Sequence, residues 1–157
     1  EAMGLAQNFG QAFAKSQMAV GSNLPKSGTL FISVKDSDKI KILPLCKKLL
    51  SLDFNIIATK GTSKYLEENN IKVTRINKVS QGRPHLVDAI KDGLVNIIFN
   101  TTEGEQSIKE SFSLRRAALS ANIPYYTTLA GSKAATEAII SLNKDELTVK
   151  PIQSYWF

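Results

Sequence analysis

Residues that support several common kinds of site are scarce in this sequence of 157 residues. Cys46 is the single cysteine, which excludes an intrachain disulfide, and its position within a helical apolar pattern favours a small core residue. His85 is the single histidine, which excludes a metal site built on several histidine ligands. No apolar run approaches the roughly 20 residues that span a bilayer. We therefore expect no metal site and no membrane partner.

Dense charge and the standard phosphate-binding motifs are also missing. The 20 basic residues exceed the 14 acidic residues, giving a formal charge of +6. They are scattered along the chain without a long basic block, so we expect no nucleic-acid partner. The sequence contains neither the G-x-G-x-x-G fingerprint of a Rossmann site nor the G-x-x-x-x-G-K-[ST] of a P-loop. An anionic small ligand remains compatible with the positive charge.

Short apolar runs alternate with helical patterns, which predicts an α/β fold with parallel strands. Strands are expected at 29–34, 54–58, 72–76, 95–99 and 125–127, and the tail at 147–150 is compatible with another. Helices are expected at 1–20, 38–51, 62–69, 85–92, 105–121 and 132–142. Thr62 is placed to cap the third helix, and Pro44 should kink the second or mark its true first turn.

Residues 21–28 have the composition of a linker. We therefore place a domain boundary here, with residues 1–27 ahead of a domain that comprises residues 28–157. Because the sequence begins with Glu1, we also expect a fragment of a longer chain. Its first helix would then pack on a neighbour that this chain lacks.

Polar residues follow each predicted strand, at the sheet edge where parallel sheets bind their ligands. These turns are rich in hydroxyls, amides, glycines and lysines, and helix starts there direct backbone N–H groups toward an anion. One turn alone is explained by capping, but their convergence favours a phosphate site. Asp36 and Asp38 suit either a carboxylate pair at this rim or a helix N-terminus. For His85 a structural hydrogen bond is favoured over a general base, and we expect no catalytic residue.

The turn sequences, in this order, resemble the C-terminal allosteric domain of the carbamoyl phosphate synthetase large subunit. The resemblance covers about residues 29–142 and is most specific at Asn77-Lys78-Val79 with Gly82-Arg83-Pro84-His85. Further matching pieces are Ser33-Val34, Asp38-Lys39, Ala58-Thr59, Gly61-Thr62, Asn100-Thr101-Thr102, Arg115-Arg116-Ala117-Ala118 and Tyr126-Thr127-Thr128-Leu129. Residues 1–4 and 9–15 are similar to the end of the preceding ATP-using synthetase domain.

The resemblance implies a methylglyoxal-synthase-like, three-layer α/β domain with a five-stranded parallel sheet flanked by helices. It implies one overlapping site for UMP as inhibitor and IMP as activator, and an ornithine site at the border with the neighbouring domain. By motif, the nucleotide and its phosphate would be held by Ser33, Lys39, Thr59, Gly61, Thr62, Lys78, Arg83, Asn100, Thr101 and Thr102. The ornithine contacts would be Tyr125 and Thr127.

The resemblance also implies partners and a location. ATP and metal ions would belong to the missing synthetase domains, so no cofactor is expected in this domain. The partners would be those domains of the same chain and the glutaminase small subunit. Together they would form a cytoplasmic, glutamine-hydrolysing, ATP-dependent ligase of pyrimidine and arginine biosynthesis.

Two alternatives compete with a regulatory domain. A methylglyoxal-synthase-type lyase acting on a triose phosphate needs carboxylate bases, but the matching turns carry Arg83, Thr101 and Thr102. A purely structural or oligomer-forming module would bind no nucleotide. The sequence also departs from the family pattern at Glu103 and Glu105, where many members carry basic residues, which makes the expected site less positive.

Overall fold

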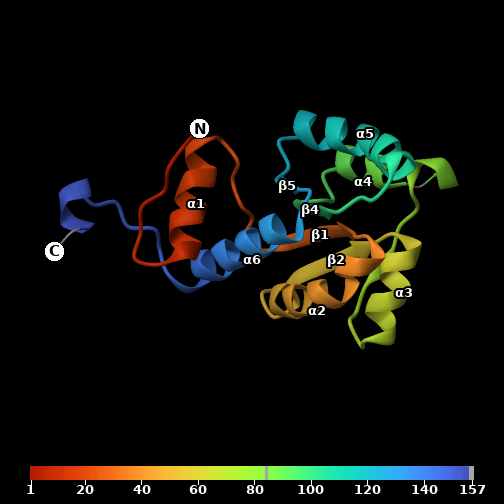
Figure 1. Ribbon diagram of the computed structural model, residues 1–157, viewed down its shortest axis with the longest axis horizontal. Helices are drawn as coiled ribbons and strands as arrows, with labels where there is room; N and C mark the ends of the chain where they lie inside the picture. Colours follow the sequence, from red (N-terminus) through yellow and green to blue (C-terminus); the bar gives the residue numbers. More distant parts are fainter. Residues whose placement is uncertain (84, 156–157) are drawn as a thin grey trace.

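The computed structural model describes residues 1–83 and 85–155, without the side chains of residues 106, 107 and 110 (Figure 1). Pro84 of the quoted motif lies outside the described residues. The strands are β1 (Gly28–Ser33), β2 (Phe54–Ala58), β3 (Thr74–Arg75), β4 (Ile97–Asn100) and β5 (Tyr125–Tyr126). The α-helices are α1 (Phe9–Ala19), α2 (Asp36–Leu50), α3 (Lys60–Glu68), α4 (Leu86–Lys91), α5 (Glu105–Ser120) and α6 (Leu129–Lys144). Two 3₁₀ turns, η1 (Val79–Gln81) and η2 (Ile152–Tyr155), complete the described elements.

The five strands form one parallel sheet in the order β3-β2-β1-β4-β5. The predicted five-stranded parallel sheet is therefore confirmed. The strand order reverses at β1, which lies between β2 on one side and β4 on the other. In sheets of this kind, the reversal leaves a crevice at the carboxyl ends of the central strands.

Helices cover both faces of the sheet, giving three layers (Figure 1). Side chains alternate along β1, so Leu30 and Ile32 join the core under α2 and α6, while Phe31 joins the core under α4 and α5. These three side chains are 0–1% exposed. Burial on both faces explains why most residues of the central strands are apolar.

The first helix packs against α6 of the same chain, which corrects the expectation that its neighbour is missing (Figure 1). Gly10 permits the approach, because a Cβ atom there would lie 2.6 Å from the Glu137 carbonyl oxygen. The Tyr126 hydroxyl on β5 also donates a hydrogen bond to Gln17 of α1 at 3.0 Å. The division into residues 1–27 and 28–157 stays a prediction.

Several predicted boundaries need correction. The first helix begins at Phe9 rather than at residue 1, because Asn8 caps it by accepting a hydrogen bond from the Gln11 N–H. Helix α2 continues through Pro44, so the proline does not mark its first turn. Residues 147–150 form no strand. No helix in the described part of the chain is both long and apolar enough to cross a membrane.

Candidate functional site

A cavity of about 670 Å³ opens at the carboxyl ends of β1, β2 and β4. The last residues of β1 and β4, the turns after all three strands and the first turns of α2 and α3 border the cavity. Residues 78–81, α4 and α5 also contribute to its lining. The cavity is lined by Phe31, Ser33, Val34, Lys35, Asp36, Lys39, Thr59, Lys60, Gly61, Thr62, Lys78, Val79, Ser80, Gln81, Leu86, Val87, Asn100, Thr101, Thr102, Glu103, Lys109, Ser111, Ser113 and Leu114.

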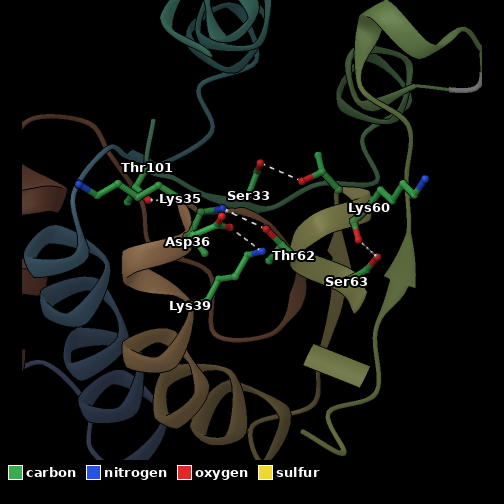
Figure 2. Close-up of polar contacts among 10 residues, drawn as sticks. Ser33, Lys35, Asp36, Lys39, Lys60, Thr62, Ser63 and Thr101 are labelled. Carbon is green, nitrogen blue, oxygen red and sulfur yellow. Dashed lines mark hydrogen bonds and ion pairs between the residues drawn. The ribbon is translucent and has the colours of Figure 1, made fainter. Parts of the chain in front are cut away.

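Hydroxyl groups connect the turns that follow β1 and β2. The Ser33 and Thr59 hydroxyl oxygens lie 2.9 Å apart in a hydrogen bond. The buried Thr62 hydroxyl accepts a hydrogen bond from the Val34 N–H at 3.2 Å (Figure 2). The sequence predicted that Thr62 caps α3, and this prediction is wrong. Thr59 occupies the cap position, and Thr62 lies inside the helix and ties it to the neighbouring turn.

A second pair of contacts connects the turns after β1 and β4. The Thr101 hydroxyl accepts a hydrogen bond from the Lys35 N–H at 3.1 Å (Figure 2). The buried Asn100 side chain donates a hydrogen bond to the Tyr125 hydroxyl on β5. These contacts hold three strand ends in a fixed relation, so the rim of the cavity is preorganised.

Of the four helices that border the cavity, α4 is capped by a side chain, whereas α2, α3 and α5 are not. Helices α2, α3 and α5 begin without a side-chain hydrogen bond to their first turn. Helices α1, α4 and α6 are capped by the side chains of Asn8, His85 and Thr128. An uncapped first turn presents backbone N–H groups and the positive end of the helix dipole, which together attract an anion.

Lys39 is the cation best placed between these helix starts. Its ammonium nitrogen lies 2.7 Å from a carboxylate oxygen of Asp36 and 5.9 Å from the centre of the Tyr65 ring. The side chain is 18% exposed. Figure 2 shows Lys39 directed toward Asp36, whereas the Lys35 and Lys60 side chains extend to opposite sides. Lys78, Lys109 and Glu103 also border the cavity.

Comparison with known proteins agrees with this architecture. A family model described as "MGS-like domain" matches residues 41–127. The chain belongs to the MGS-like domain family. It is also similar to proteins named carbamoyl phosphate synthase large chain. The one from Mesorhizobium japonicum is 51% identical over 156 residues, which are 99% of this chain and 13% of the relative. Those from Myxococcus xanthus and Methanobrevibacter smithii are 48% and 44% identical over 155 residues, or 99% of this chain and 14% of each relative.

This MGS-like domain therefore spans 13–14% of the length of the relatives that it matches. The matched part is the C-terminal region of the large chain. The resemblance inferred from the turn motifs is thereby confirmed.

Most of the predicted site residues come together in the domain. The cavity lining includes Ser33, Lys39, Thr59, Gly61, Thr62, Lys78, Asn100, Thr101 and Thr102. Arg83 does not line it: the side chain is 79% exposed, and its guanidinium lies 3.6 Å from the Asp88 carboxylate. Tyr125 and Thr127 also lie outside the lining. Tyr125 is half-buried, and Thr127 is exposed at the end of β5.

Lining residues on α5 were missed by sequence reasoning. Lys109, Ser111 and Ser113 contribute to the cavity from this helix. They follow no strand, so a search of the strand ends does not find them. Which α5 side chains face the cavity depends on the orientation of the helix about its own axis, and the packing of Leu114 and Ala118 on the sheet fixes that orientation. The amphipathic pattern of residues 105–121 was the available signal.

The single histidine and the single cysteine have the structural roles predicted. The His85 Nδ1 atom accepts a hydrogen bond from the Asp88 N–H at 3.3 Å, and the Asp88 carboxylate accepts one from the His85 N–H at 3.2 Å. Cys46 is fully buried, and burial raises the pKa of its thiol to about 12. Among the side chains that the structure describes, which exclude that of residue 110, no three His, Cys, Asp or Glu residues gather in a metal-binding group.

Proposed function

We propose that this chain is the regulatory domain of a carbamoyl phosphate synthase large chain and that it binds UMP or IMP through the phosphate. The enzyme would be the cytoplasmic, glutamine-hydrolysing, ATP-dependent ligase of pyrimidine and arginine biosynthesis. The partners of the domain would be the synthetase domains of the same polypeptide and the glutaminase small subunit. The observation that carries the proposal is the cavity at the strand ends, where Lys39 meets the uncapped start of α3.

The phosphate is proposed to lie between Lys39 and the first turn of α3. A Cβ atom at Gly61 would lie 3.7 Å from the Lys39 ammonium nitrogen, so the backbone and the cation face the same small space. A glycine here lets an anion reach the backbone N–H groups closely. The Thr59 and Thr62 hydroxyls border this space and supply neutral hydrogen bonds. Such a set combines charge, dipole and donors, as phosphate binding requires.

The nucleoside is proposed to occupy the part of the cavity nearer α4 and α5. The volume of about 670 Å³ is within the range of small-molecule sites. The half-buried Val87 and the edges of Leu86 and Leu114 supply apolar surface suited to a base. Asn100 and Thr102 supply polar groups suited to a ribose or to base edges. Lys78 would add a second positive charge near the phosphate.

Ornithine is proposed to bind at Tyr125 and Thr127, outside the cavity. The Tyr125 hydroxyl accepts a hydrogen bond from Asn100, which lines the cavity. One side chain thus touches both proposed sites, so a ligand at either would alter the position of the same amide. The carboxylates that would recognise the ornithine amine are expected in the neighbouring domain.

Regulation requires that the nucleotide favour one of two states of the protein. We propose that the phosphate orders residues 78–83, because Lys78, Val79, Ser80 and Gln81 border the cavity and several of these residues are exposed. Amide hydrogen exchange of this segment should slow at saturating UMP or IMP. Exchange that is the same with and without a nucleotide would refute this step while leaving binding itself intact.

Amide chemical shifts measured by NMR during titration with UMP and IMP test the location of the site. The amides of Gly61 and Thr62 should shift as the ligand saturates the site, whereas that of Gln17, which lies in α1 outside the cavity lining, should not. Shifts confined to residues outside the cavity would contradict the proposal.

A further inference from the structure

An ion pair occupies the place proposed for the phosphate. The Asp36 carboxylate lies 2.7 Å from the Lys39 ammonium nitrogen, and both residues line the cavity. The two partners differ in exposure: the Lys39 side chain is 18% exposed and the Asp36 side chain is 93% exposed. The cation is held by its surroundings, whereas the carboxylate reaches it from the solvent side.

We propose that the Asp36 carboxylate competes with the ligand phosphate for Lys39 and so lowers the affinity of the site. This inference rests on the proposed function, because it names a residue that tunes the same phosphate site. The carboxylate supplies an oxygen to the ammonium at a distance typical of a charged hydrogen bond, as a phosphate oxygen would. An arriving anion must therefore displace the carboxylate or bind beside it against like-charge repulsion.

The exposure of Asp36 makes displacement the easier course. An exposed carboxylate regains full hydration when it leaves the ammonium, so breaking the pair costs little. Lys39 stays in place because its stem is largely buried and its ammonium group lies near the Tyr65 ring. Asp36 also begins α2, where a negative charge suits the helix dipole. The same residue thus stabilises the helix start and weakens the anion site beside it.

The test compares the wild-type chain with two variants that each remove one exposed carboxylate. Asp36→Asn removes the competitor. Glu68→Gln also removes one negative charge, from the ion pair of Glu68 with Lys64. Glu68 is the last residue of α3, and neither partner of this pair lines the cavity. The dissociation constants of inorganic phosphate and UMP are measured for all three chains at low and high ionic strength. Thermal unfolding of each chain checks that the fold is intact.

Asp36→Asn should tighten binding of both anions by about two- to fivefold at low salt, the scale of an exposed ion pair. The gain should shrink at high salt, where exposed charges are screened. Glu68→Gln should leave affinity unchanged. An Asp36→Asn chain that binds no tighter than wild type, or an equal gain in affinity in Glu68→Gln, would overturn this inference but leave the proposed function standing. Absence of binding in all three chains would overturn the proposed function and this inference with it.

Discussion

Replacing Thr62 with valine tests the hydrogen bond that ties α3 to the turn after β1. The Thr62 side chain is 2% exposed, and its hydroxyl accepts the Val34 N–H at 3.2 Å. Valine has nearly the same shape, so packing is preserved while the acceptor disappears. Val34 is itself buried, at 7% exposed. Its N–H would then lie in the interior without a protein partner.

The expected loss follows from the cost of an unsatisfied buried donor, which is about 1–3 kcal/mol. For a chain of this length, each kcal/mol lowers the midpoint of thermal unfolding by about 2–4 °C. Thr62→Val should therefore reduce the free energy of unfolding by about 1–3 kcal/mol. Chemical and thermal denaturation followed by circular dichroism would measure both quantities.

Thr136→Val is the matched control. Thr136 is 1% exposed, and its hydroxyl donates to the Ser132 carbonyl one turn earlier in α6. Removing this hydroxyl leaves no backbone group orphaned, because that carbonyl also accepts the regular helical hydrogen bond. The control should lose about 1 kcal/mol or less. If Thr62→Val loses no more stability than Thr136→Val, the assigned role of Thr62 is refuted.

Three further outcomes are expected. Gly61→Ala should leave the midpoint of thermal unfolding unchanged or raise it, since alanine favours helix by about 0.5–1 kcal/mol. The same change should weaken UMP binding, because the added methyl group would block the approach of the phosphate to the backbone; unaltered affinity would argue against a phosphate there. Tyr125→Phe should weaken nucleotide binding about two- to tenfold, because the Asn100 amide loses its acceptor; equal affinities in calorimetry would contradict this. Burial raises the pKa values of Cys46 and Tyr126 to about 12. The folded chain then keeps protons that the unfolded chain releases, so denaturation should show stability falling from about pH 9 to 12; a flat profile would count against both shifts.

The sheet could be predicted from the sequence because its central strands are buried on both faces. The run at residues 29–34 is apolar except for Thr29 and Ser33, and helical patterns separate it from the next run. The edge strand β3 is shorter than expected, with Thr74 and Arg75 both exposed, so little burial holds it in the ladder. The predicted start of the N-terminal helix was also too early. The apolar spacing before residue 9 suggested helix, but the cap at Asn8 determines where the helix begins.

The site was predictable where it depends on strand ends alone. Parallel strands bring their carboxyl ends to one edge, so the polar turns at Thr59 and Asn100 had to meet. The direction of a side chain was not predictable, because a threonine near a helix start serves its own helix or a neighbouring turn equally well. Thr62 does the latter. The partner of α1 could not be predicted from the sequence either. Gly10 and Ala14 indicate that another element packs closely on the helix, but they do not identify that element.

Calorimetric titration of this chain with UMP and then IMP, with inorganic phosphate as the reference, tests the central claim most directly. The account predicts saturable one-to-one binding of at least one nucleotide, tighter than that of phosphate, because the nucleoside adds contacts in the cavity. If neither nucleotide binds, the cavity is not a nucleotide site in this chain, and a structural module becomes the better description.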